Sequence, residues 1–270
     1  MKPGRDEREA ESTINAKPRN WATNQAARPL PLIYGRHRLG GTFISDLFDT
    51  EAKPIYQSYG GSGSMATQVI VGYNYYGSFA LALCHGPVSK VLEIWANGVR
   101  VWDGDVDRGN DDDPAELDTD VGTVELYWGT AAQNPDGDLD HGIAYRYVCY
   151  AVAKQIHFGQ SPTPPNLEFV IERHTEGLAL SAHDLDGDAV LPEVIYDLLT
   201  SPVYGCGVDD GHLDAASFEG AAEAVIDEDL GVSPSWRQPT TFRQALADLL
   251  GYVGGVVYFR DGKIHWKLLR

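Results

Sequence analysis

From Pro29 to about Arg173 the chain is rich in β-branched and aromatic residues, and its apolar positions approach the two-residue period of β-strands. The sharpest local signal is Asn97-Gly98 between two short apolar runs, because this pair adopts the positive φ angles of a type I′ hairpin turn. We therefore expect strands at residues 67–76, 78–84, 91–96, 99–102, 121–128, 143–152 and 167–173. The pattern predicts a β-barrel or β-sandwich in this half of the chain.

After about Thr175 the apolar period changes to 3.6, which predicts amphipathic helices. Apolar stripes mark three of them, at residues 194–199, 218–225 and 242–250. Thr241 and Gln244 form a capping box at the start of the third helix. A second hairpin is expected at residues 256–268, around Asp261-Gly262. The predicted fold class is α+β, with the β-rich half first.

The same patterns divide the chain into three expected segments. Residues 1–24 mix acidic and basic side chains without an apolar core, which predicts a flexible arm or one that docks on a neighbouring subunit. Residues 25–174 form the β-rich domain, and residues 175–270 form an α+β segment. Because the last hairpin ends close to the final residue, we expect this segment to come from the front part of a longer protein.

Composition excludes several classes of protein. The 270 residues are 43% apolar and 10% aromatic, which is too apolar for a disordered chain. A net charge of −18 opposes sequence-specific binding of nucleic acid, which needs clustered Lys and Arg. We find neither a secretory signal nor a membrane-spanning segment. The three cysteines, which form no C-x-x-C pair, are expected to be buried and free.

Acidic clusters are the main candidates for chemistry. Residues 103–120 hold nine carboxylates and one arginine, and the Asp136–Asp140 and Asp184–Asp188 stretches repeat the one-three-five spacing of a calcium loop. The sets that start at Asp103 and Asp136 lack the glycine and the glutamate that complete an EF-hand. A solvated, self-repelling loop is therefore the main interpretation of residues 103–120. A calcium-dependent adhesion module remains an alternative.

No catalytic or cofactor motif is present. The eight histidines form no H-E-x-x-H or H-x-H pair, and neither G-x-S-x-G nor a phosphate-binding loop occurs. We therefore predict no catalytic residues, no metal site and no cofactor. The six Trp, fourteen Tyr and many carboxylates leave a carbohydrate-binding or glycoside-hydrolysing module as the main alternative.

The segment from Val194 to Gly207 carries a more specific pattern, a helix ending in L-T-x-P-x-Y-G-x-G. Its matching residues are Leu199, Thr200, Pro202, Tyr204, Gly205 and Gly207. This segment resembles the tail-tip hub proteins of long-tailed bacteriophages, the family of lambda-like tip attachment proteins and gene-transfer-agent hub proteins. Physically, Pro202 ends the helix, and Gly205 and Gly207 are expected to allow a left-handed turn.

Weaker matches to the same family precede this segment in the expected order. They include the Leu30–Gly41 stretch, the Gly86-Pro87 turn, and the hairpin that carries Trp95 and Gly98. His85 stands where the family usually has an acidic residue, and the Phe158–Pro165 stretch carries extra prolines. The resemblance covers roughly residues 29–268.

The resemblance implies a structural virion protein, a homotrimeric baseplate hub at the distal end of the tail tube. Its implied partners are the distal tail protein, the tape-measure protein, further tail-tip or receptor-binding proteins, and DNA that passes without specific binding. Acidic walls suit such a conduit because they do not adhere to phosphates. We accordingly expect residues 103–120 to face the lumen.

Overall fold

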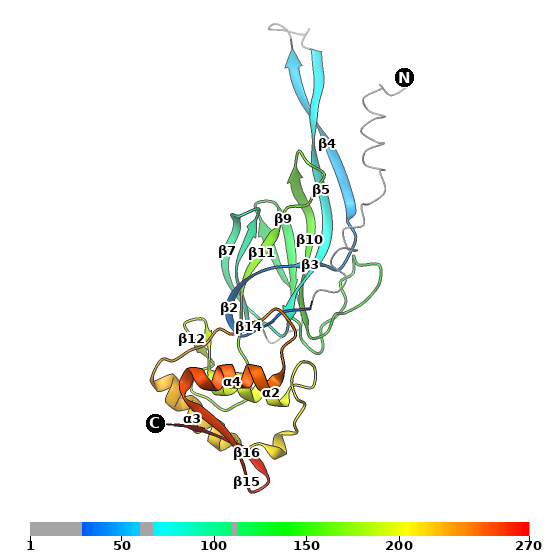
Figure 1. Ribbon diagram of the computed structural model, residues 1–270. Coiled ribbons are helices and arrows are strands. Elements are labelled where there is room, and N and C mark those ends of the chain that lie inside the picture. The colour runs from blue at the N-terminus through cyan, green and yellow to red at the C-terminus, as the bar shows by residue number, and fades with distance from the viewer. Residues whose placement is uncertain (1–28, 60–66, 110–112, 270) are drawn as a thin grey trace.

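The computed structural model describes residues 29–59, 67–109 and 113–269. It confirms the α+β class: strands dominate the first half, and the three α-helices of the described chain come late. Two sheets form the upper body in Figure 1, and the helices lie below them.

The larger sheet has six strands. Five of them follow one another in the order β3–β5–β10–β9–β8, and β4 pairs with β5 over residues 67–78. The bounds are β3 Thr42–Phe43, β4 Phe48–Tyr59, β5 Thr67–His85, β8 Ala115–Thr119, β9 Gly122–Tyr127 and β10 Val148–Gly159.

The second sheet has four antiparallel strands in the order β2–β11–β6–β7. The bounds are β2 Gly35–Gly40, β6 Lys90–Ala96, β7 Val99–Asp107 and β11 Leu167–Arg173. The β6–β7 turn confirms the Asn97-Gly98 prediction, with φ angles of 50° and 81°. Side chains from both sheets form one apolar core, including Leu81 of β5 and Phe169 of β11.

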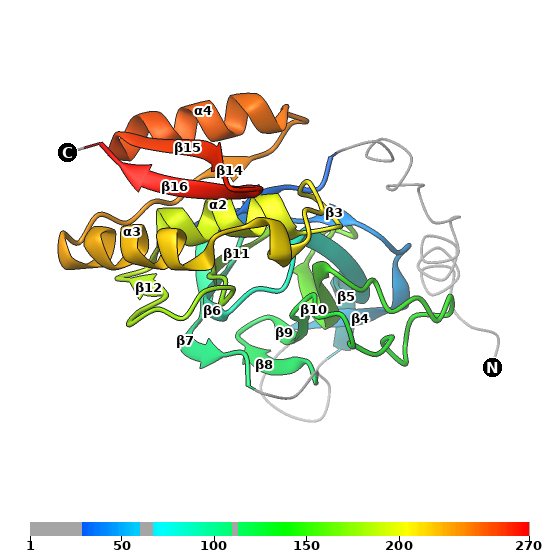
Figure 2. The same ribbon diagram turned by 90° about the horizontal axis from the view of Figure 1, so that it is seen from below.

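The second half has its own core, built on helices α2 Leu191–Thr200, α3 Ala215–Asp227 and α4 Phe242–Val253. Thr241 caps α4 as predicted, accepting a hydrogen bond from the Gln244 amide, but the Gln244 side chain donates to Asp248, so only this half of the predicted capping box forms. The last hairpin, β15 Gly255–Arg260 and β16 Lys263–Leu268, turns at Asp261-Gly262 as predicted. In Figure 2 it lies between α4 and α3, which each contact one of its strands.

Short elements complete this half and join it to the first. They are β12 Asp184–Leu185, β13 Asp188–Ala189 and the 3₁₀ turn η2 Asp210–His212. The two-residue strand β1 Leu32–Ile33 pairs with β14 Ser235–Trp236, so the two halves share a small sheet. None of the helices in the described residues combines the length and the hydropathy that a membrane span requires.

Several predicted boundaries are wrong. The two strands expected on either side of Gly77 are one strand of 19 residues, β5. Gly77 lies inside this strand and does not interrupt it. A Cβ at this position would lie 2.9 Å from the Phe158 ring, so the glycine leaves space for that ring. The strand expected from Ile143 begins at Val148. β4 was not predicted, and the tip of its hairpin lies outside the described residues.

Residues 103–120 are also more ordered than predicted. Asp103, Asp105 and Asp107 lie in β7, and Glu116 and Asp118 lie in β8. Strand pairing and two cationic side chains offset the repulsion between these carboxylates. Arg100 contacts Asp103, and Lys90 contacts Asp105 and Asp107. Residues 110–112 of this stretch lie outside the described residues.

The cysteines are free in the structure. Cys84 and Cys149 are buried and face each other across β5 and β10. Cys206 is exposed, so the prediction of burial is wrong for this residue. It lies in the turn after α2, where the chain leaves the core.

Candidate interaction site between the two halves

A buried polar cluster joins the end of β11 to helix α2. Arg173 has no exposed surface, and its guanidinium donates to Asp197 Oδ2 at 3.2 Å, to the carbonyl of Ile33 at 3.2 Å and to the Tyr204 hydroxyl. The guanidinium also lies over the Tyr34 ring, 4.3 Å from its centre. One carboxylate and two aromatic rings therefore surround a cation taken entirely out of water.

Asp197 is the acceptor at the centre of this junction cluster. The Tyr34 hydroxyl donates to its Oδ2 at 2.5 Å, and the Tyr204 hydroxyl donates to the same oxygen at 2.9 Å. Burial is the largest cause of a raised pKa at both tyrosines, and it raises the pKa of Tyr204 to about 12. Burial alone lowers the pKa of Arg173, but Tyr34, Tyr204 and Asp197 outweigh it and raise the pKa. The Arg173 guanidinium therefore stays charged, and both tyrosine hydroxyls stay neutral, at neutral pH.

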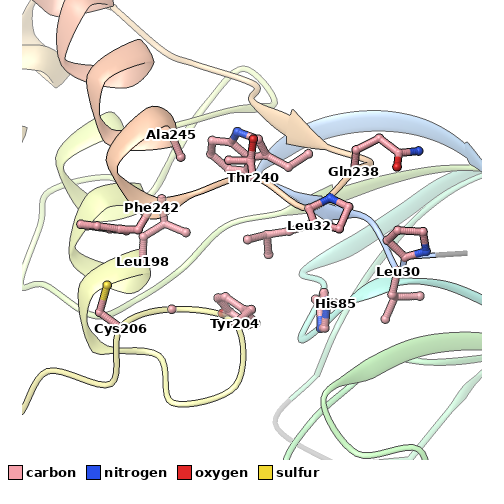
Figure 3. Close-up of a pocket in the computed structure, with 14 residues that line it drawn as sticks. Leu30, Leu32, His85, Leu198, Tyr204, Cys206, Gln238, Thr240, Phe242 and Ala245 are labelled. Atoms are coloured by element: carbon pink, nitrogen blue, oxygen red, sulfur yellow. The ribbon is translucent and has the colours of Figure 1, made fainter.

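A groove of about 360 Å³ opens beside this cluster. Figure 3 shows residues from both halves around it, with Leu30, Leu32 and His85 from the first half and Leu198, Tyr204 and Phe242 from the second. The His85 and Tyr204 rings lie 5.4 Å apart. Burial, and then the charge of Arg173, lower the pKa of His85, so the groove is apolar and uncharged along this side. None of the described residues that line it is acidic.

The segment from Leu199 to Gly207 forms the turn that presents Tyr204. Leu199 is buried in the second core, and the Thr200 hydroxyl donates to the Tyr196 carbonyl. Pro202 comes directly after the C-cap residue Ser201, so the helix ends before the proline as predicted. Gly207 has φ +63°, as the expected left-handed turn requires.

Gly205 is needed for a different reason from the one predicted. Its φ is not positive; instead, a Cβ there would lie 2.4 Å from the Leu198 carbonyl oxygen. The turn packs so closely on the end of α2 that only glycine fits without a shift of the backbone.

The other motif residues fall in two places. Gly86 and Pro87 follow His85 at the groove, and Gly86 packs against Gly129, 2.6 Å from where its own Cβ would lie. Trp95 and Gly98 lie instead in the β6–β7 hairpin, where Arg38 stacks on the Trp95 ring. The ten motif residues therefore do not form one site.

A two-stranded arm extends from the first half of the chain. β10 pairs with β5 only from Tyr75 onward, so in the described chain residues 67–74 of β5 have β4 as their only ladder partner. Figure 1 shows β4 and β5 projecting away from the body, opposite the helices. Tyr56, Val69 and Val71 on this arm are 56%, 45% and 51% exposed.

The acidic sets found in the sequence are separated. Asp136 is buried, and its Oδ2 accepts from the Tyr127 hydroxyl at 3.0 Å and lies 3.7 Å from Lys154 Nζ. These contacts give Asp136 a structural role. Asp184 and Asp188 flank the β12–β13 turn, where Asp188 accepts from Ser233. These placements do not assemble an EF-hand geometry.

The junction cluster was not predicted from the sequence. Leu167, Phe169 and Ile171 mark the buried face of β11, and Arg173 continues the same alternation. A charged residue at an inward-facing position signals a buried ion pair. Its partner Asp197 is 24 residues away on a helix, and the sequence carries no signal for that contact.

Comparison with known proteins gives limited similarity. No protein-family model matches the chain, and no curated protein sequence matches it. Among solved structures, it is similar to a chain in a structure titled "Virion of native gene transfer agent (GTA) particle". The two are 18% identical, with a TM-score of 0.44. The alignment covers 89% of this chain and 52% of that one, so this chain spans about half of its neighbour's length.

Proposed function

We propose that this chain is a non-enzymatic structural protein of a phage-like virion. It forms a homotrimeric hub at the distal end of a tail tube, contacts the distal tail and tape-measure proteins and further tail-tip proteins, and lets DNA pass. The family motifs, which occur in order along the sequence, support this assignment. The structural feature that carries it is the projecting β4–β5 arm.

The arm is built for contact with another subunit. A two-stranded ribbon alone is only marginally stable in water, and the unpaired edges of such a ribbon are templates for adding a strand. Lys53 is the only charged residue in the described part of the arm beyond Glu51, although the whole chain has a net charge of −18. A nearly neutral arm with apolar side chains can approach a second acidic copy without strong repulsion. We therefore assign the arm to the contact between neighbouring copies.

The acidic edge of the four-stranded sheet suits a DNA conduit. Asp103, Asp105 and Asp107 alternate along β7, the edge strand, and their side chains are mainly exposed. We assign this edge to the lumen, where negative charge keeps phosphates from adhering. Carboxylates on an edge strand also oppose unwanted pairing with other strands.

The carbohydrate-active alternative receives no support from the groove. A glycosidase needs two carboxyl groups about 5–10 Å apart across the bound sugar. The groove has Tyr204, Trp236 and Phe242 on its walls, but none of its described lining residues is a carboxylate.

The proposal is tested by the mass of the full chain in solution and by its dependence on the arm. Val71→Lys places a charge on the exposed arm, and Val99→Lys, at a residue 65% exposed in the β6–β7 hairpin, is the matched control. We expect light scattering to give a trimer for the wild type and the control at high concentration, and a monomer for Val71→Lys. A wild type that stays monomeric, or a Val71→Lys variant that still forms trimers, would contradict the proposal.

A further inference from the structure

A second polar cluster lies at the end of β11, on the far side of the chain from the Arg173 side chain. Glu172 Oε2 is 3.5 Å from His174 Nε2, and Asp184 Oδ1 is 3.7 Å from the same nitrogen. The ligand-type atoms of the three residues all lie within 4.8 Å of one another. Glu172 belongs to β11, His174 follows it, and Asp184 begins β12.

The separations fit a shared ion better than direct hydrogen bonds. A hydrogen bond between a ring nitrogen and a carboxylate oxygen measures about 2.7–3.2 Å. Ligand atoms at about 2.1 Å from a tetrahedral ion stand about 3.4 Å apart. The 3.5 Å and 3.7 Å separations at His174 Nε2 are close to this second value.

The His174 ring is buried, and its two nitrogens make no hydrogen bonds with the described residues. Its side chain is 7% exposed. A buried polar group without a partner is costly, and an ion on Nε2 removes that cost at this nitrogen. The main chain of His174 is already fixed, because Ser89 Oγ accepts from its amide at 3.0 Å.

The two carboxylates are held in place by their other contacts. Glu172 is 1% exposed, and its Oε1 accepts from Arg36 Nε at 2.6 Å, which leaves Oε2 for an ion. Asp184 Oδ1 accepts from the Gly187 amide at 2.6 Å, which sets the side-chain orientation. Hydrogen bonds of this kind commonly orient metal ligands. Two carboxylates against one guanidinium leave a net negative charge for a cation.

We propose that Glu172, His174 and Asp184 bind one divalent metal ion, with Zn²⁺ as the ion that suits one imidazole and two carboxylates. The ion attaches the β12–β13 hairpin to the end of β11, and so the second half of the chain to the first. This site was not predicted, because the three residues match no metal motif. Only Asp184 belonged to a spaced acidic set.

The test uses the full chain, freed of metal by a chelator and dialysed, with ZnCl₂ as the probe in about 0.15 M salt to screen the acidic surface. Asp184→Asn removes one ligand charge and keeps the side-chain oxygen that accepts from Gly187. Asp186→Asn is the matched control, because Asp186 is exposed in the same turn and asparagine tolerates its φ of +53°.

We expect calorimetric titration to give one Zn²⁺ site per wild-type chain, and a hundredfold excess over Kd to raise the Tm by about 5–11 °C. Asp184→Asn and His174→Gln should each weaken binding at least tenfold, whereas Asp186→Asn should bind as the wild type does. Absence of a stoichiometric site in the wild type would overturn the proposal. Equal binding by Asp184→Asn and Asp186→Asn would also overturn it, since this is the behaviour of a diffuse acidic surface.

Discussion

Replacing Asp197 by asparagine tests the energetic role of the junction cluster. The change removes the only carboxylate that the structure places against Arg173 within the described residues, at 3.2 Å. Because Arg173 has no exposed surface, its charge then stays buried with only neutral partners, which are the Tyr204 hydroxyl, the Tyr34 ring and the Ile33 carbonyl. The variant should therefore be less stable without any loss of side-chain volume.

The magnitude follows from the geometry. Removing one partner of a fully buried ion pair costs about 3–5 kcal/mol. The Asp197 side chain is 20% exposed, and asparagine keeps one oxygen that can accept from Tyr34 or Tyr204. We therefore expect the lower end, about 3 kcal/mol in the free energy of unfolding, and a fall in Tm of about 6–12 °C.

Urea unfolding, followed by tryptophan fluorescence and extrapolated to water, measures this loss. Asp229→Asn is the control, because Asp229 is exposed and its positive φ suits asparagine. The control should change stability by less than about 0.5 kcal/mol. A loss below about 1 kcal/mol for Asp197→Asn would refute the reasoning, since Arg173 would then not depend on this carboxylate.

Three further predictions concern the same half of the chain. Gly205→Ala should cost at least about 2 kcal/mol in thermal unfolding, because its Cβ would lie 2.4 Å from the Leu198 carbonyl oxygen. The contribution of the Tyr204 hydroxyl to the free energy of unfolding, measured as the difference from Tyr204→Phe, should be fully present below pH 10. It should be lost as the pH rises through the pKa of about 12 that Tyr204 has in the folded chain. Thr241→Ala should cost about 1 kcal/mol in a thermal melt, because it removes the cap that accepts from the Gln244 amide.

Matched variants make these predictions specific. Gly220→Ala in α3 should be neutral or stabilising, because a Cβ there meets nothing within 4 Å. Tyr252→Phe, at a residue 68% exposed, should change the free energy of unfolding by less than about 0.5 kcal/mol at neutral pH. A Gly205→Ala variant as stable as Gly220→Ala, or a pH-independent effect of Tyr204→Phe, would contradict the packing and burial described for the turn.

Local signals in the sequence were sufficient for part of the fold. The Asn97-Gly98 and Asp261-Gly262 turns and the Thr241 cap depend on residues a few positions apart, and the structure confirms them. β4 could not be predicted in this way. It contains Pro54, which edge strands tolerate, and its stability depends on pairing with β5 across the hairpin.

The candidate sites show the same limit more clearly. Arg173 sits at an inward-facing position that the alternation of β11 could have marked, but only the folded chain brings Asp197 to it. The Glu172, His174 and Asp184 cluster likewise needs the β12–β13 hairpin to fold back on β11. Among the motif residues, Tyr204 and Gly205 lie at the junction, and the roles implied for the whole set stay predictions.

The most direct test of the proposed hub is antibody labelling of tailed particles from a lysate of the host, viewed by electron microscopy. Serum raised against this chain should place gold at one end of the tail, at the tip. Unlabelled particles, with the antigen confined to the soluble fraction, would contradict the assignment of this chain to the virion.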